Sequence, residues 1–297
     1  MSDAPGGMSL TLPLEVCAAL HAGALMIWFG SLSLHRILGV ARQGVEPRTL
    51  WIAAVVALAS GLLWPWLQTG VVTADARSAL DPQAVWQLLT QTTFGRTWLV
   101  RQVFVLLALL ATLVPLLATG RGAYFLVAAA VASIALLGHA AGAPGTFGTV
   151  QRLALALHLL AAGAWLGALP DLWALAGRMP SADLASILRR FSPYGMALVS
   201  IVVATGVLSA WFRLGGLDPL ISSDYGRILL SKVGLVALMG VAALNNRNRL
   251  TPKLERPDLV VQAQGRKELR RSIAAETALG LAVVAAAVLL GSAEAPH

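Results

Sequence analysis

The sequence predicts an all-α polytopic membrane protein, with eight transmembrane helices arranged as two parallel four-helix repeats. Composition is the first observation behind this prediction. Of the 297 residues, 57% are hydrophobic and only 12% are charged, with a mean hydropathy of +0.74. A soluble domain carries about 25% charged residues. The charges are clustered, and the stretches between them approach the ~20 apolar residues that a helix needs to cross a bilayer.

Eight apolar segments are the second observation. The hydrocarbon core contains no water to satisfy backbone polar groups, so these segments are expected to be helices. Their ranges are 11–36, 49–70, 97–118, 122–141, 150–175, 193–214, 226–247 and 272–291.

The distribution of basic residues orients these helices. With both termini on the periplasmic side, most of the 22 Lys and Arg residues lie on the opposite side of the membrane, as the positive-inside rule requires. The longest connection on that side is the basic segment 248–271, which we interpret as a cytoplasmic loop. The net charge of +8 is therefore explained by loop topology, and no nucleic-acid partner is expected.

An internal repeat is the third observation. The first apolar segment contains ALHAGALMIWFG, with His21 and Trp28, and the fifth contains ALHLLAAGAWLG, with His158 and Trp165. The second and sixth segments contain ASGLL and ATGVL. The third and seventh begin with FGRTWLVR and YGRILLSK, and the fourth and eighth end with LLGHA and LLGSA. Four short matches in the same order indicate two related halves, 1–141 and 142–297.

An even number of helices per half gives both halves the same orientation. The halves are then related by a pseudo-twofold axis along the membrane normal. His21 and His158 are expected at the same depth, and they face each other if the first and fifth helices face the axis. Arg101 and Lys232 occupy equivalent positions in the two halves. Their side chains are expected either to reach the membrane surface or to pair with Glu15, which is near the start of the first helix.

Polar groups inside a bilayer are costly, so they usually have a function or a partner. Three histidines fall in the outer half of the predicted bundle, and neutral imidazole is a common ligand of copper, zinc and iron. The thiol of Cys17 lies one helical turn before His21, and thiolate ligands favour Cu(I). The predicted metal ligands are His21, His158, His139 and Cys17. The alternative for each histidine is a hydrogen bond to a neighbouring helix.

A stripe of side chains continues from the predicted metal site along the first helix. His21, Trp28 and His35 follow one another at intervals of seven residues, which keeps them close to one face of a helix. The hypothesis is a translocation path formed by Trp28, His35, Trp165 and Met26. The alternative is a packing seam between helices, and for the tryptophans packing is the preferred interpretation.

The sequence shows no sign of an enzyme. It has no nucleotide-binding loop, nucleophile elbow or HExxH motif, so no catalytic residue is assigned. Its single cysteine, Cys17, excludes an internal disulfide and a CxxC motif.

Four stretches of the sequence resemble the CopD family of bacterial copper-resistance membrane proteins. They are GHA at 138–140, HLLAAGAWLGAL, RRFSPYGM and YGRILLSKVGLVALMGVAALNNRNRLTP. The resemblance implies an eight-helix inner-membrane protein that handles copper, with import toward the cytoplasm. It also implies membrane histidines at His21, His139 and His158, and it raises a periplasmic copper-binding protein as a partner.

A rival function remains open on the sequence. Two histidines at one depth on different helices would suit bis-axial ligation of haem b in an electron-transfer membrane protein. A third alternative is a structural or assembly subunit with incidental histidines. An absorption spectrum together with metal analysis would separate the three.

Overall fold

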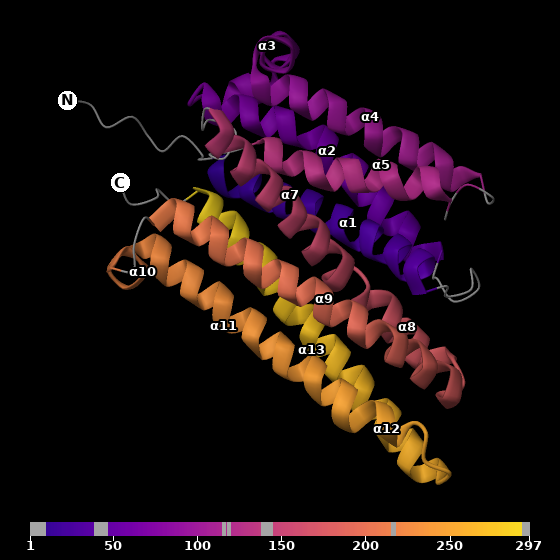
Figure 1. Cartoon of the computed structure of the whole chain (residues 1–297). Coiled ribbons are helices and arrows are strands. Elements are labelled where there is room, and N and C mark those ends of the chain that lie inside the picture. The colour runs from indigo at the N-terminus through magenta and orange to yellow at the C-terminus, as the bar shows by residue number, and fades with distance from the viewer. Residues whose placement is uncertain are drawn as a thin grey trace.

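The computed structural model describes residues 10–38, 47–114, 117, 120–137, 145–214 and 218–292, and this part of the chain contains helices and no strand (Figure 1). The long helices are α1 (Thr11–Leu38), α2 (Pro47–Val72), α4 (Thr93–Leu113), α5 (Arg121–Ala132), α7 (Gly145–Leu166), α9 (Ser181–Leu214), α11 (Asp224–Asn245) and α13 (Leu259–Ser292). The short ones are α3 (Pro82–Gln91), α8 (Leu169–Arg178), α10 (Asp218–Ser222) and α12 (Thr251–Lys253).

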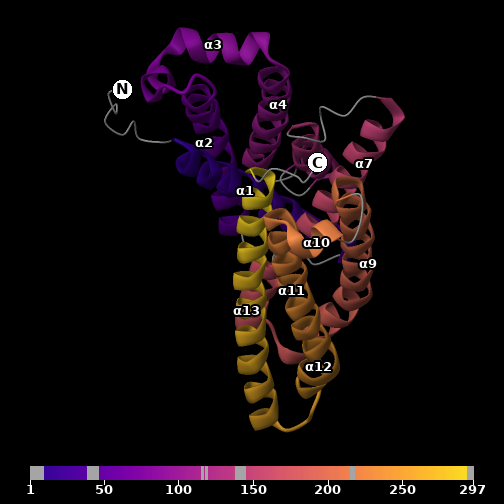
Figure 2. The same ribbon diagram turned by 90° about the vertical axis from the view of Figure 1, so that its left-hand side faces the viewer.

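The helices form two groups that meet along α1 and α7. Figure 1 shows α1, α2, α4 and α5 on one side and α9, α11 and α13 on the other, with α7 between them. Helix α3 lies across the end of the bundle where α4 begins, and the end of α11, α12 and the first part of α13 extend from the opposite end (Figure 2). The start of α1 and the end of α13 lie at the same end of the bundle.

Seven helical stretches in the described part of the chain are long and apolar enough to cross a membrane. The predicted fourth helix, 122–141, differs. Its described portion is α5 followed by a 3-10 turn, Ser133–Leu136, and this apolar stretch ends at Leu136. At about 1.5–2 Å per residue it spans less than the ~30 Å of a hydrocarbon core. Eight full-length spans are therefore not found in the described residues.

A side chain from α4 contacts the point where α5 changes to a 3-10 turn at Ser133. The Nη2 group of Arg101 donates a hydrogen bond to the Ser133 carbonyl oxygen at 3.0 Å. The amide of Leu137, which would bond to that carbonyl in an α-helix, donates instead to Ile134 O at 3.1 Å. The Arg101 hydrogen bond thus coincides with the change to the tighter 3-10 form in the last turn.

Two other predicted boundaries change. The predicted helix 150–175 is interrupted between α7 and α8, because Pro170 at the start of α8 has no N–H for an intrahelical bond. The predicted loop 248–271 is mostly helical, since a π-helical turn (Asn246–Leu250) and α12 extend α11, and α13 begins at Leu259. The Asp258 side chain accepts hydrogen bonds from the amides of Val260 and Val261 and caps that start.

Helices α1 and α7 cross with their backbones in contact. A Cβ atom on Gly30 would meet the backbone of Gly167, and one on Gly167 would meet the carbonyl oxygen of Met26. Small residues permit this approach, which is typical of helix pairs in membranes. Trp28 and Trp165 are buried beside the crossing and belong to the hydrophobic core.

The two halves also share a local structure at the starts of α4 and α11. The amide of Gly95 donates to Thr92 Oγ1 at 2.9 Å, and the amide of Gly226 donates to Ser223 Oγ at 3.0 Å. A Cβ on either glycine would strike the preceding short helix, α3 or α10. These contacts agree with the FGR and YGR match, while a repeat of the complete four-helix unit stays a prediction.

Replacing Gly30 with alanine is expected to destabilise the protein by about 1–3 kcal/mol, because the added methyl group must separate two backbones. Thermal unfolding of the purified protein in detergent measures the effect. Gly23→Ala is the matched control on α1, since a Cβ there meets nothing within 4 Å and alanine favours a helix. Equal melting temperatures for the two variants would contradict the close crossing.

Candidate metal centre

One face of α1 carries Cys17 and His21 to the same point on α2. The His21 ring is fully buried, with Nδ1 2.9 Å from the Ala57 carbonyl oxygen and 3.3 Å from Ser60 Oγ. The Cys17 thiol is also buried and donates a hydrogen bond to the Ser60 carbonyl oxygen at 3.2 Å. The i,i+4 spacing aligns the two side chains on α1, and both meet the same turn of α2.

The hydrogen bonds of His21 define its tautomer. A carbonyl oxygen only accepts, so the proton of a neutral His21 ring lies on Nδ1 and points at Ala57. The other nitrogen, Nε2, is buried and forms no hydrogen bond with the described residues. An imidazole held through Nδ1–H by a backbone carbonyl, with its second nitrogen open, is the usual arrangement of a metal-binding histidine.

A chain of contacts connects His21 to a buried cation. The ring of Trp64 on α2 meets the His21 ring edge-on at 5.5 Å, and the Arg101 guanidinium lies 5.8 Å from the Trp64 ring centre. Arg101 is fully buried, and its Nε donates to Ser133 Oγ at 2.8 Å. The prediction that Arg101 reaches the membrane surface or pairs with Glu15 is therefore wrong, because the side chain is buried and its Nε and Nη2 groups bond to Ser133 inside the bundle.

The second half contains a similar but simpler arrangement. His158 is half-buried on α7, with Nδ1 3.0 Å from Thr205 Oγ1 on α9. Thr205 corresponds to Ser60 in the matched ASGLL and ATGVL segments. Ala154 stands where the first half has Cys17. The thiol is consequently confined to the first half.

The two histidines do not meet at the α1–α7 crossing. His21 and His158 each precede their crossing glycine, Gly30 or Gly167, by nine residues. At about 100° per residue, nine residues turn a side chain to the opposite face of the helix. The structure thus turns each imidazole toward the second helix of its own half, α2 or α9, and differs from the predicted face-to-face pair.

No three His, Cys, Asp or Glu side chains converge on a metal-sized site within the described ranges. Cys17 and His21 are the two predicted ligands that the structure brings together. His139, the predicted third ligand, lies outside the described residues. Ser133, six residues before it, is joined to the site through Arg101 and Trp64.

The four residues of the predicted path have different surroundings in the structure, and the path itself stays a prediction. Trp28 and Trp165 belong to the hydrophobic core, which agrees with their packing interpretation. Met26 adjoins Gly163 and Gly167 at the α1–α7 crossing. His35 is half-buried near the end of α1.

A buried carboxylate was missed on the sequence. Asp171, in the first turn of α8, is fully buried and accepts a hydrogen bond from the Ser31 hydroxyl on α1. It is the only acidic residue in the apolar segment 150–175, and this was the signal that could have identified it. Asp171 lies just after the break between α7 and α8, on the His35 side of the crossing.

Replacing Ser133 with alanine is expected to cost about 1.5–3 kcal/mol, because the buried Arg101 Nε loses its hydrogen-bond acceptor. Chemical or thermal unfolding in detergent measures the loss. Ser222→Ala is the control, since this exposed hydroxyl only bonds to Asp218 O within its own turn. If Ser133→Ala unfolds like the control, the Arg101 contact does not stabilise the fold.

Two family models match the chain. The model described as Copper resistance protein D-like, N-terminal domain, matches residues 8–149, and the model described as Copper resistance protein D matches residues 185–290. Together they cover both helix groups.

Three relatives are similar over much of the chain. Inner membrane protein YebZ of Escherichia coli K12 is 31% identical over 235 residues, which are 78% of this chain and 79% of the relative. Copper transport protein CutJ of Bacillus subtilis 168 is 30% identical over 92% of this chain, which spans about half (51%) of that relative. Copper resistance protein D of Pseudomonas syringae pv. tomato is 29% identical over 69% of this chain and 70% of its own length. No solved structure matches the chain. The chain belongs to the copper resistance protein D (CopD) family.

Proposed function

We propose that the protein binds Cu(I) between α1 and α2 and transports it across the bacterial inner membrane. Copper is the cargo, and Cys17 and His21 are its first ligands. The observation that carries the proposal is the convergence of these two buried side chains on the Ser60 turn, with His21 Nε2 left open.

The chemistry of this pair favours copper in its reduced state. A thiolate is a soft ligand that selects Cu(I), and imidazole also suits copper. Cu(I) with one thiolate and one neutral imidazole carries no net charge, which reduces the cost of placing it inside a bilayer. His139 is the proposed third ligand.

The proposed direction is import, from the periplasm to the cytoplasm. Both termini are then periplasmic, as the positive-inside distribution favours. His21 is ten residues from the start of α1, or about 15 Å along the helix, which supports a site in the outer half of the membrane. The names of two relatives, a copper transport protein and a copper resistance protein, support a copper-related function. A periplasmic copper-binding protein is the proposed donor.

The inner half of the proposed path contains polar groups on the same helix. Ser31 and His35 are four residues apart on α1, and Ser31 bonds to Asp171. These groups offer oxygen and nitrogen ligands beyond the packed Trp28 layer. In this proposal the protein is a transporter and not an enzyme.

Haem b, the alternative from the sequence, gains no support from the geometry. Bis-axial ligation places two imidazoles on opposite sides of one iron. His21 and His158 bond to different helices in different halves, so no observation favours a shared haem.

We expect His21→Ala to weaken Cu(I) binding by at least about 100-fold, because it removes a ligand from a site with few. Cys17→Ser is expected to weaken it similarly, since a hydroxyl is a hard ligand. Competition with a Cu(I) chelator, using purified protein in detergent, measures the affinity.

His158→Ala is the matched control for this experiment. It removes the corresponding imidazole from the half that has Ala154 in place of a thiol, so it should retain near-wild-type affinity. Equal losses of Cu(I) affinity in His21→Ala and His158→Ala would indicate that both halves contribute to the copper site. Unchanged binding in His21→Ala and Cys17→Ser would reject the site. A Soret band in the same preparation would support haem instead.

The transport direction has a separate test. Cells expressing the wild-type chain are expected to accumulate more copper than cells expressing Cys17→Ser, as measured by elemental analysis of washed cells. Lower copper in the wild-type cells would contradict import.

A further inference from the structure

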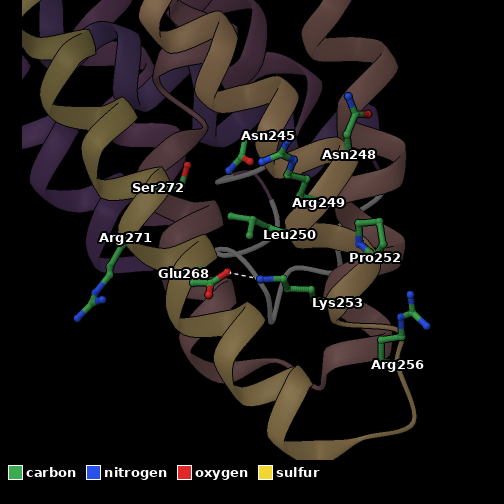
Figure 3. A pocket seen from close by; sticks show the side chains of 10 residues that line it. All are labelled: Asn245, Asn248, Arg249, Leu250, Pro252, Lys253, Arg256, Glu268, Arg271 and Ser272. Atoms are coloured by element: carbon green, nitrogen blue, oxygen red, sulfur yellow. Dashed lines mark hydrogen bonds and ion pairs between the residues drawn. The ribbon is translucent and has the colours of Figure 1, made fainter.

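A second polar site lies at the opposite end of the bundle from Cys17 and His21. It is a cavity of about 670 Å³ between the end of α11, the π-helical turn, α12 and the polar first part of α13. Figure 3 shows its lining side chains. They are Asn245, Asn248, Arg249, Leu250, Pro252, Lys253, Arg256, Glu268, Arg271 and Ser272.

The charge of this cavity is strongly positive. Four of its lining residues are basic and one, Glu268, is acidic. Glu268 is already paired with Lys253, whose Nζ lies 2.6 Å from its Oε2 (Figure 3). The nearby Glu255 is held by Arg189. Among the described carboxylates, none forms an ion pair with Arg249, Arg256 or Arg271. Arg249 points toward Asn245, whereas Arg256 and Arg271 extend outward at the edge of the cavity (Figure 3).

Specific packing builds the cavity. A Cβ on Gly265 would lie 2.7 Å from Lys253 Cβ, so the glycine allows α13 to approach α12 closely. The side-chain amide of Asn246, on the π-helical turn, donates a hydrogen bond to the carboxylate of Glu276 on α13. Thr251 Oγ1 donates to the Asn246 carbonyl oxygen at 2.8 Å. Turns of π-helix inside α-helices are frequent at functional sites.

The cavity coincides with the border between apolar and charged sequence on both helices. The apolar part of α11 ends at Asn245, and the apolar part of α13 begins after Ser272. Leu238, Val241 and Leu244 on α11 are exposed, as expected for a surface that faces lipid tails. Val241, Asn245 and Asn248 follow at helical spacing, so this apolar surface leads directly to the polar lining.

We propose that this cavity binds the phosphate group of an anionic phospholipid. Arg249, which points toward Asn245 in Figure 3, contacts the phosphate. Arg271, which extends outward from α13 in the same view, turns toward the phosphate when the lipid binds. Asn245 and Ser272 donate hydrogen bonds, and the acyl chains lie along the exposed face of α11. Guanidinium groups suit phosphate because they donate several hydrogen bonds in a fixed geometry. Basic pockets between transmembrane helices on the cytoplasmic side are typical lipid headgroup sites. This site is independent of copper binding.

The test uses the full-length chain, stripped of lipid in an uncharged detergent and titrated with phosphatidylglycerol or phosphatidylcholine. Native mass spectrometry counts the bound lipids. The wild type is expected to bind phosphatidylglycerol in preference to phosphatidylcholine. The double variant Arg249→Gln/Arg271→Gln is expected to bind phosphatidylglycerol roughly 30-fold more weakly, at about fivefold for each basic residue near a headgroup.

The matched control is Arg77→Gln/Arg96→Gln, which removes two exposed arginines from the other end of the bundle. The control is expected to bind phosphatidylglycerol like the wild type. Equal affinities in the two double variants would overturn the proposal. If the glutamine variant does not fold, Arg249→Lys/Arg271→Lys replaces it. This variant keeps the charge but loses the fork geometry, and wild-type selectivity for phosphatidylglycerol in it would overturn the guanidinium contacts.

Inorganic phosphate distinguishes the two sources of the anion. Millimolar phosphate is expected to leave the bound phosphatidylglycerol in place, because it lacks the acyl chains that contact α11. Full displacement of phosphatidylglycerol by inorganic phosphate would show that the cavity binds a free anion and would overturn the proposal of a lipid ligand. The copper affinity of the double variant should equal that of the wild type, which separates this result from that of the proposed copper site.

Discussion

The backbone contact between α1 and α7 is the constraint on which the rest of the structure depends. Gly30 and Gly167 leave no room for a side chain, so the rotation of each helix about its own axis is fixed at that point. Every other residue on α1 then has a determined direction. Met26, one turn away, faces the crossing, whereas His21, nine residues away, faces the opposite side and contacts α2. The same spacing turns His158 toward α9.

Two similar histidines therefore have different chemical surroundings. His21 is fully buried, its Nδ1 is held by a backbone carbonyl, and Cys17 reaches the same turn of α2. His158 is half-buried and bonds to a hydroxyl, with Ala154 in place of the thiol. Thiolate is the soft ligand that selects Cu(I), which is why the copper site is proposed in the first half. Matched sequence patterns can thus support a binding site in one half and packing in the other.

Buried polar groups shape the fold as well as the candidate site. Arg101 donates a hydrogen bond to the Ser133 carbonyl oxygen, where α5 gives way to a 3-10 turn. The same side chain overlies Trp64, which contacts His21, so a cation inside the bundle is coupled to the candidate metal centre through an aromatic ring. At the other end, the arginines around α12 stay accessible because they lie beyond the apolar parts of α11 and α13. The two ends of the molecule consequently offer different chemistry, with soft ligands at one and guanidinium groups at the other.

The sequence alone determined the helical membrane architecture, because long apolar segments allow little else in a bilayer, and it identified Cys17 and His21 as an aligned pair on one helix. It also identified the matched short segments, whose capping contacts at Thr92 and Ser223 are equivalent in the structure. Only the tertiary structure decided which way the histidines face, because spacing along one helix does not say which face meets a neighbour. The partner of Arg101, the break before Asp171 and the basic cavity likewise depend on contacts between segments distant in sequence, and no local pattern records those contacts.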